Sequence, residues 1–265
     1  LTLSWLTYCL AYTLRVNIAV VIPAIIAEFD YTYTQMGLVT SLYFVTYMFG
    51  QLINGYLGDR VSSKGLIVTG LVGSALCNLG VALAPSFVIL SLCWALNGLL
   101  QSMLWAPLMK TLSVWFHGYQ LERVSFIMAL TVIFGYALSW GASSVLTTQL
   151  GWTYAFYLPV LIVLLFAGVM ALFFRDQPDG TSADADQPES VPANDNESDQ
   201  AVPPGTTAEG DLPVLQFLRM IRLPGLLLIA LTQGIIREGI TIWFPTILES
   251  SGRFTAGSPW LILII

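Results

Sequence analysis

Apolar stretches of about 20 residues recur along this 265-residue chain and limit the folds open to it more than any other feature. A helix needs about 20 mostly apolar residues to cross a hydrocarbon core of about 30 Å, whereas a barrel strand needs about 10. Hydrophobic residues make up 56% of the chain and charged residues 10%, against about 25% charged residues in soluble domains. The sequence therefore predicts an all-α membrane protein.

The apolar stretches divide into seven complete spans and the start of an eighth, roughly at residues 3–27, 35–57, 66–84, 86–109, 124–148, 153–174, 223–248 and from 258 onward. We expect residues 1–174 to form an N-terminal six-helix transmembrane bundle. Residues 214–265 would begin a second bundle, with helix seven and part of helix eight. Because the chain lacks an initiator methionine and begins and ends in apolar runs, we expect it to be a fragment.

The segment between the two predicted bundles, residues 175–213, is acidic and low in aromatic residues. It carries ten of the sixteen Asp and Glu residues, so it accounts for the net charge of −6. A segment of this composition cannot bury enough apolar surface to order itself, and we interpret it as a disordered linker. The negative charge therefore indicates no nucleic acid or other charged macromolecule as a partner.

The basic residues outside the apolar spans give an orientation. Seven of the eight fall on one side, and only Arg253 falls on the other; the seven are Arg60, Lys64, Lys110, Arg123, Arg175, Arg219 and Arg222. Basic residues concentrate in cytoplasmic loops. We therefore expect a multi-pass protein of the plasma (inner) membrane, with the N-terminus and the linker 175–213 in the cytoplasm.

Two arginines lie inside apolar spans, Arg15 in the first and Arg237 in the seventh, and each has a proline eight residues downstream, Pro23 and Pro245. An arginine at the bilayer centre costs roughly 2.5–3.5 kcal/mol on insertion scales, so it is rarely without a role. The matched spacing indicates a repeated unit with an anion site between two halves, an arrangement typical of transporters. The structural alternative is an ion pair, but the first six spans offer no carboxylate at mid-membrane.

Glu238 directly follows Arg237. Neighbouring residues in a helix point about 100° apart, so we expect the two side chains to face each other poorly. Burial raises the pKa of a carboxyl group and a nearby arginine lowers it, which makes Glu238 a candidate for proton coupling. A helix–helix anchor is an equally good interpretation.

The loop after the second span reads Gly-Tyr-Leu-Gly-Asp-Arg-Val-Ser-Ser-Lys over residues 55–64. It resembles the signature loop of the major facilitator superfamily, which implies a gating role for Gly55, Asp59, Arg60 and Lys64. Ser62 and Ser63 depart from the glycine and the basic residue that are usual in this loop. Small residues let helices approach closely, and Asp59 could pair with a basic side chain or a helix N-terminus. The simpler alternative is a tight turn with solvated charges.

The resemblance narrows within that superfamily. Leu14-Arg15-Val16-Asn17 in the first span, and Arg237 through Trp243-Phe244-Pro245-Thr246 in the seventh, are similar to the organophosphate:phosphate antiporters and the related anion:cation symporters. The resemblance implies a major facilitator fold with arginines from both halves binding one anion. It also implies a substrate cavity between the two halves, and it places span six on the lipid side of the bundle.

Two positions depart from the phosphate-exchanging relatives, in which a lysine lies in span two and a histidine in span five. In the alignment that this resemblance gives, Gln51 and Phe134 occupy these positions. The loss of two cationic groups weakens the case for a doubly charged phosphate ester as the substrate. It favours a carboxylate or a singly charged anion, and both classes stay open.

Polar side chains share helical faces inside the spans. Asn97, Gln101 and Trp105 recur at intervals of four residues in span four, as do Gln233, Arg237 and Thr241 in span seven. We expect such groups to face a cavity or another helix, because lipid offers them no partners. The predicted substrate-binding residues are Arg15, Arg237, Tyr12, Tyr47, Gln51, Gln101 and Gln233; interhelical hydrogen bonding is the alternative for each polar residue.

We expect a secondary active transporter that moves a small organic anion, either a phosphate ester or a carboxylate, by alternating access. Inorganic phosphate, a proton or sodium would be the coupling ion, the lipid bilayer the surroundings, and a monomer the working form. A membrane sensor that binds an anion without moving it is the alternative. The sequence shows no nucleophile–base set and no metal-ligand spacing, so we expect neither an enzyme nor a cofactor or metal.

Overall fold

A computed structural model describes residues 1–58, 60–176 and 223–250. Of these, residues 1–176 and 241–250 belong to one compact unit and residues 223–240 to another, and each unit is described by itself. Most of the predicted linker, residues 177–213, and the predicted eighth span lie outside the described residues.

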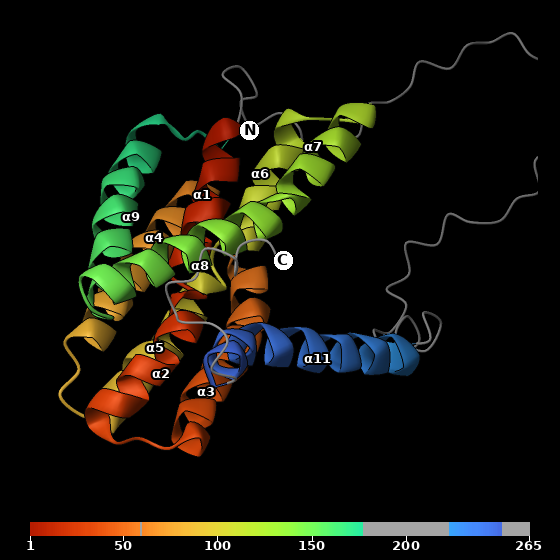
Figure 1. The fold of residues 1–265 in the computed structure, drawn as a ribbon. Coiled ribbons are helices and arrows are strands. Elements are labelled where there is room, and N and C mark those ends of the chain that lie inside the picture. The colour runs from red at the N-terminus through yellow and green to blue at the C-terminus, as the bar shows by residue number, and fades with distance from the viewer. Residues whose placement is uncertain (59, 177–222, 251–265) are drawn as a thin grey trace, which may run out of the picture. The chain divides into compact units, whose positions relative to one another are not determined.

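Six stretches of the described chain are long and apolar enough to cross a membrane (Figure 1). The first comprises α1 (Thr2–Thr13) and α2 (Asn17–Phe29), the second α3 (Tyr33–Gly58) and the third α4 (Ser63–Ala82). The fourth comprises α5 (Phe87–Gln101) and α6 (Trp105–Trp115), and the fifth α7 (Tyr119–Ala129) and α8 (Thr131–Gln149). The sixth is α9 (Tyr154–Phe173). The prediction of an all-helical membrane protein is therefore confirmed.

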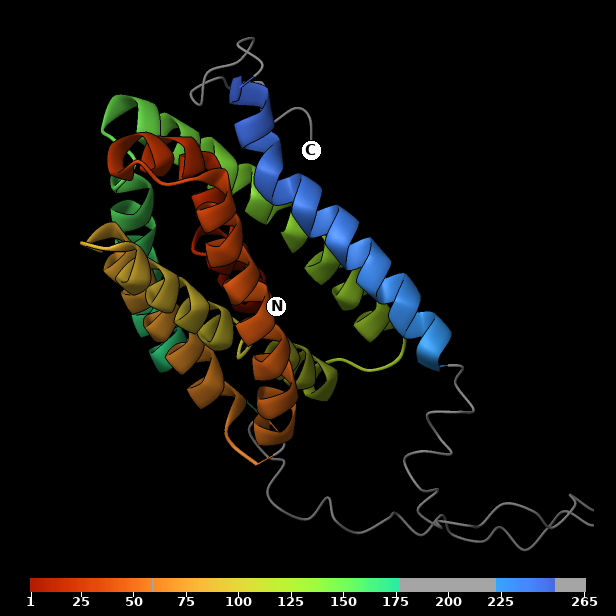
Figure 2. The same ribbon diagram turned by 90° about the horizontal axis from the view of Figure 1, so that it is seen from below.

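The helices of this bundle pack both against sequence neighbours and against helices distant in the chain. Helix α3 lies against α5, α4 against α5 and α9, and α1 against α8 (Figure 2). Helices α3 and α5 approach closely at two glycines: a Cβ added to Gly98 would lie 2.3 Å from the carbonyl oxygen of Tyr43, and one added to Gly50 would lie 2.2 Å from Ser102 Oγ. Both glycines therefore set the spacing of this pair.

Spans one, four and five each consist of two helices, a feature that the sequence did not predict. In span five, Leu130 alone separates α7 from α8. In span four, residues 102–104 separate α5 from α6. Pro107 explains this interruption, because a proline inside a helix removes one hydrogen bond and clashes with the carbonyl four residues earlier. In the observed structure Pro107 lies in the first turn of α6, where the missing N–H has little cost.

The interruption of span one covers residues 14–16 and contains Arg15. Pro23 cannot account for it, because this proline lies in the interior of α2. The carbonyl oxygen of Leu14, inside the interruption, instead accepts hydrogen bonds from two buried side chains, one on α4 and one on α5.

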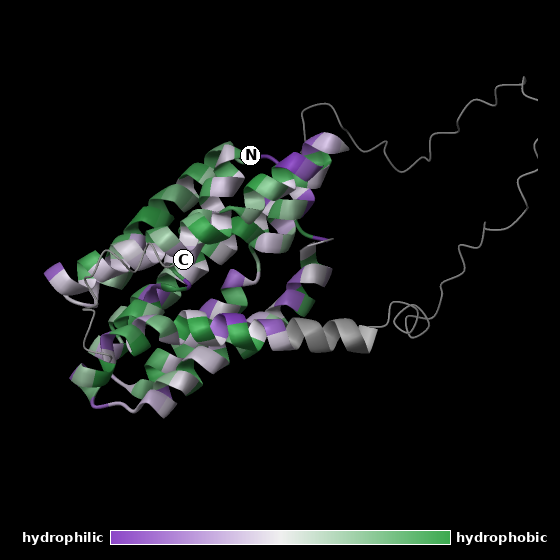
Figure 3. Cartoon of the chain, turned by 45° about the vertical axis from the view of Figure 1, so that its right-hand side comes forward, coloured by the Kyte–Doolittle hydropathy of each residue, from purple (hydrophilic) through white to green (hydrophobic). Residues whose placement is uncertain are grey.

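The core of the bundle forms two apolar clusters, one containing Leu14, Leu71 and Leu104 and the other Tyr43 and Trp94. Apolar residues prevail along the helices (Figure 3). Large apolar side chains are also exposed, among them Leu165 and Leu172 of α9 at 67% and 78%. Such a surface is costly in water and suits a lipid environment.

Helix α11 (Leu223–Ser250) is a 28-residue helix that contains Pro245. It corresponds to the predicted seventh span and carries Arg237 and Glu238.

Candidate anion site and gating loop

The guanidinium group of Arg15 lies among tyrosine rings. Its central carbon is 4.8 Å from the ring centre of Tyr47, 5.7 Å from that of Tyr12 and 5.8 Å from that of Tyr43. A cation within about 6 Å of an aromatic ring centre is attracted by about 0.5–2 kcal/mol, depending on how far it is desolvated. Together with Tyr8, whose ring centre is 5.5 Å from that of Tyr12, these rings form what we call the tyrosine cluster.

The tyrosine cluster connects Arg15 with a neutral amide. Gln51 lies one turn after Tyr47 on α3, and its Nε2 donates a 2.8 Å hydrogen bond to the Tyr47 hydroxyl. The structure thus brings together four of the predicted binding residues, namely Arg15, Tyr12, Tyr47 and Gln51. Their part in binding a substrate stays a prediction.

Gln101 lies in a different environment. Its side chain is buried, and its Nε2 donates a 3.1 Å hydrogen bond to the carbonyl oxygen of Ala11 on α1. Asn97 is also buried and donates to the carbonyl oxygen of Leu14 at 2.9 Å. Both residues share one side of α5, as the spacing predicted. Both contacts are hydrogen bonds between helices, which is the alternative to substrate binding that the sequence left open for these residues.

Two residues that support the tyrosine cluster were missed in the sequence. A Cβ added to Gly135 of α8 would lie 2.6 Å from the Tyr12 ring, so only glycine leaves room for this ring. The ring of the next residue, Tyr136, lies 5.1 Å from that of Tyr12. Phe134, by contrast, is 54% exposed and makes an edge contact with Trp5. A glycine inside an apolar span was the available signal for Gly135.

On α11, Arg237 and Glu238 form an ion pair, with Arg237 Nε and Nη2 both donating to Glu238 Oε1 and the Nε contact at 3.1 Å. The expectation that these neighbours face each other poorly is wrong, because both side chains are long enough to bend along the helix surface. The Arg237 side chain is 61% exposed, and exposed ion pairs contribute only about 0–1 kcal/mol.

Gln233 is exposed one turn before Arg237. Arg15 and Arg237 belong to different units, so the joint binding of one anion by both arginines stays a prediction.

The predicted gating loop joins α3 to α4 and is held at the start of α4. Ser62 caps this helix, since its Oγ accepts a 3.1 Å hydrogen bond from the Gly65 amide. Asp176, just beyond α9, accepts from Ser62 Oγ at 2.7 Å and from the Lys64 amide at 2.8 Å. Serine at position 62, a departure from the superfamily pattern, is therefore a helix cap whose hydroxyl also binds Asp176.

The same loop is held at the end of α3. Lys110 Nζ donates a 2.7 Å hydrogen bond to the carbonyl oxygen of Gly58, and cations near a helix C-terminus are stabilising. Arg60 lies over the Tyr56 ring at 4.0 Å.

In the described chain, the positions that a side chain would occupy at the two glycines of the gating loop are open. A Cβ added to Gly55 or Gly58 would have no neighbour within 4 Å. The close contact between helices that was expected at Gly55 and Gly58 is therefore not seen among the described residues. Gly50 and Gly98 allow such a contact instead. Asp59 lies outside the described residues, and gating by the loop stays a prediction.

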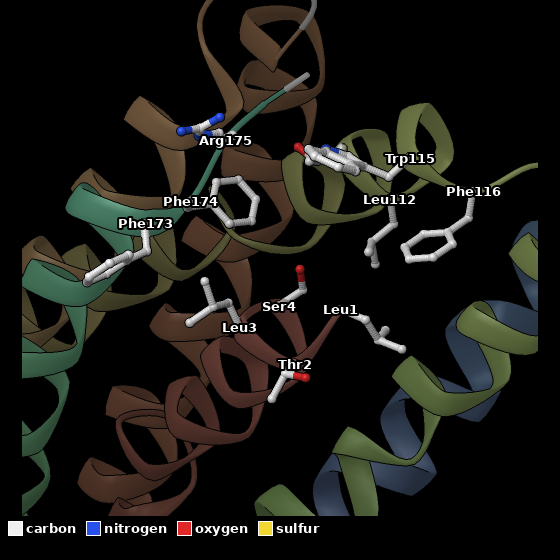
Figure 4. A pocket seen from close by; sticks show the side chains of 11 residues that line it. Leu1, Thr2, Leu3, Ser4, Leu112, Trp115, Phe116, Phe173, Phe174 and Arg175 are labelled. Atoms are coloured by element: carbon white, nitrogen blue, oxygen red, sulfur yellow. The ribbon is translucent and has the colours of Figure 1, made fainter. Parts of the chain in front are cut away.

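A separate cavity of about 350 Å³ lies at the N-terminal end of α1 (Figure 4). Its lining is mostly apolar and aromatic and includes Ser4, Leu112, Trp115, Phe174 and Arg175. Ser4 and Arg15 are eleven residues apart, roughly 16 Å along a helix. This cavity is therefore not the surroundings of Arg15.

Comparison with curated proteins gives relatives of low identity. The chain is 23% identical over 171 residues to a probable hexose phosphate transport protein of Chlamydia muridarum, covering 64% of this chain and 38% of the relative. It is 28% identical over 172 residues to a glycerol-3-phosphate transporter of Bacillus subtilis, covering 63% and 38%. It is also 27% identical over 112 residues to the membrane sensor protein UhpC of Salmonella typhimurium, covering 42% and 25%. The chain thus spans well under half the length of these relatives.

Among solved structures, a bacterial homologue of the human lysosomal transporter Spinster, inward-facing and unoccupied, superposes with a TM-score of 0.75. The identity is 15%, and the match covers 99% of this chain and 57% of the other. This similarity establishes the fold alone. The family model of the Major Facilitator Superfamily matches residues 4–265. The chain therefore belongs to the Major Facilitator Superfamily.

Proposed function

We propose that the protein containing this chain is a secondary active transporter of a small organic anion. The observation that carries the proposal is the location of Arg15, at the interruption of a membrane span and within 4.8–5.8 Å of three tyrosine ring centres. Discontinuous helices at mid-membrane are where transporters of this architecture bind substrate. A planar guanidinium offers two parallel donors, which suit a carboxylate or a phosphate group.

The charge near Arg15 bears on the class of anion. Two relatives are named for phosphate esters, which supports such a substrate. Gln51 supplies a neutral amide next to Tyr47, so this side of the site adds hydrogen-bond donors without a second cation. We therefore propose an anion with a phosphate ester or carboxylate group, and we test the two classes against each other.

In the proposed transport cycle the anion binds Arg15 from the N-terminal half and Arg237 from the C-terminal half. The bound anion offsets the cost of desolvating both arginines and draws the halves together. Rocking of one half against the other then exposes the site to the opposite side.

We propose that the N-terminus and the linker are cytoplasmic, that the plasma membrane holds the protein, and that it works as a monomer.

The test is uptake into proteoliposomes that contain the purified full-length protein, with radiolabelled glycerol 3-phosphate and glucuronate as probes. We expect uptake of at least one probe, and its loss in Arg15→Lys and in Arg237→Lys, because lysine keeps the charge but lacks the two parallel donors. The control is His117→Ala in an exposed loop, which should transport normally. Normal uptake by both arginine variants would refute the two-arginine site.

A sensor is the second candidate, favoured by the similarity to the membrane sensor protein UhpC. It requires the same anion site but no completed transport cycle. Saturable binding of either probe without uptake or counterflow in the same proteoliposomes would establish the sensor and refute the transporter.

A further inference from the structure

We propose that Asn78 and Asn97 are positioning residues for Arg15, because they hold the interruption of span one in one conformation. This inference rests on the proposed anion site at Arg15. It assigns a role to buried amides on α4 and α5 whose contacts are with the backbone of span one.

The interruption creates a need for hydrogen-bond partners. An uninterrupted helix satisfies its own carbonyl oxygens, whereas the last carbonyls of α1 lose their usual partners where the helix ends. Within a membrane these groups must be satisfied by other parts of the protein. The carbonyl oxygen of Ala11 accepts from the Leu14 amide and from Gln101 Nε2, both at 3.1 Å.

Leu14, directly before Arg15, has two such partners. Its carbonyl oxygen accepts from Asn78 Nδ2 at 3.0 Å and from Asn97 Nδ2 at 2.9 Å. The two asparagines come from different helices, α4 and α5, and both side chains are 0% exposed. The peptide that leads into Arg15 is therefore fixed from two directions.

The chain on the other side of Arg15 is fixed by the same group. Asn17, the first residue of α2, donates from Nδ2 to Asn78 Oδ1 at 3.1 Å and to the carbonyl oxygen of Ala155 at 3.2 Å. Asn78 Nδ2 also donates to the carbonyl oxygen of Ser74 at 3.0 Å. Asn78 thus connects residues 14 and 17, which flank Arg15, and its own two donor protons and its acceptor are all in use.

These contacts distinguish positioning from substrate contact. The Asn78 amide nitrogen spends both protons on backbone carbonyls, and the side chain is fully buried, so it cannot also donate to an anion. Its effect on binding passes through the backbone at Arg15. A site that binds by two parallel donors depends on their direction. In enzymes, a misplacement of about 1 Å caused by a distant mutation costs up to about a hundredfold in rate.

The first experiment measures the surroundings of position 15 without any substrate. In full-length protein with Cys9, Cys77 and Cys93 replaced by serine, Arg15→Cys is labelled with a positively charged methanethiosulfonate reagent. We expect Asn78→Leu and Asn97→Leu each to change the labelling rate by about tenfold, the scale of local coupling energies. Asn97→Gln, which keeps the donor, should restore much of the original rate.

Asn54→Leu is the matched control. Asn54 is also a buried asparagine, but its Nδ2 donates to Ser102 Oγ at 2.7 Å, at the interruption of span four and not at that of span one. This variant should leave the labelling rate at position 15 unchanged. Equal changes in all three leucine variants would mean that any buried amide has this effect, and unchanged rates in Asn78→Leu and Asn97→Leu would likewise overturn the inference. If a leucine variant does not fold, Asn97→Ser replaces it.

The second experiment measures binding of glycerol 3-phosphate and glucuronate to purified full-length protein. We expect Asn97→Leu to raise the dissociation constant of the bound probe about tenfold in the wild type but not in an Arg15→Ala background, because coupled residues are non-additive. Equal losses in both backgrounds would mean that Asn97 acts without Arg15. A wild type that binds neither probe refutes the proposed function, while the labelling rates still decide the positioning role.

Discussion

Tyr47 accepts a 2.8 Å hydrogen bond from Gln51 Nε2, and its ring centre lies 4.8 Å from the guanidinium carbon of Arg15. One tyrosine therefore joins the cation of span one to the neutral amide of span two. Position 51 is where the phosphate-exchanging relatives have a lysine according to the sequence resemblance. The charge of this residue is thus a candidate determinant of anion class.

Gln51→Lys should shift preference toward the more highly charged anion. A second cation near Arg15 adds a charge-assisted contact worth about 1.5–3 kcal/mol to a phosphate ester with two charges. We expect the ratio of inhibition constants, glucuronate over glycerol 3-phosphate, to rise about tenfold or more. Gln51→Met removes the hydrogen bond to Tyr47 without adding charge, so it should leave this ratio unchanged. An unchanged ratio in Gln51→Lys would remove position 51 from the selectivity of the site.

Gly135→Ala should destabilise the bundle and disturb the tyrosine cluster. The added methyl group would lie 2.6 Å from the Tyr12 ring, and overpacking of this kind costs about 1–3 kcal/mol. The readout is the thermal unfolding midpoint of the solubilised protein, which should fall. Gly168→Ala on α9 is the matched control, because its methyl group would meet nothing within 4 Å. Equal midpoints for the two variants would contradict the packing seen at Tyr12.

Asp176→Ala should weaken the start of α4 through its bonds to Ser62 and the Lys64 amide. Loss of a helix cap costs about 0.5–2 kcal/mol. Since Ser62 is both the cap and a partner of Asp176, Ser62→Ala and Asp176→Ala should be non-additive in the unfolding midpoint. Ser62→Gly, closer to the superfamily loop, should cost only a few tenths of a kcal/mol at the cap itself. Additive effects in the double variant would mean that Asp176 stabilises α4 independently of the cap.

Glu238→Gln tests proton coupling. The substitution keeps the shape of the side chain but removes the carboxylate that accepts from Arg237. We expect counterflow of the substrate to persist and accumulation driven by a proton gradient to stop. Accumulation at the wild-type level would exclude Glu238 as the proton carrier and leave exchange, or another group, as the basis of coupling.

The helical membrane fold could be predicted from the sequence because a hydrocarbon core admits only helices and closed barrels. Runs of about 20 apolar residues fix the spans, and the exposure of Leu165 and Leu172 suits a lipid environment. The shared side of Asn97 and Gln101 followed from helical periodicity. The orientation rests on Arg60, Lys64 and the other basic residues of the loops and stays a prediction.

The sequence did not reveal what these polar residues bind. Periodicity gives the face of a helix but not the atom opposite it, so Gln101 could equally have lined a cavity or bonded to Ala11. The interruption at Arg15 has no proline or glycine signal of its own, since Pro23 lies well inside α2. It depends on amides from α4 and α5 that are 61 and 83 residues distant from their partners in span one. Only the packed structure shows that convergence.

The central claim is that Arg15 binds the anion. Equilibrium binding of glycerol 3-phosphate and glucuronate to purified full-length wild type and Arg15→Lys tests it most directly, because binding does not depend on the rest of the transport cycle. Loss of the two parallel donors should weaken binding of the preferred anion about tenfold to a hundredfold, the worth of a charge-assisted contact. Equal dissociation constants for the wild type and Arg15→Lys, with both proteins folded, would contradict the account.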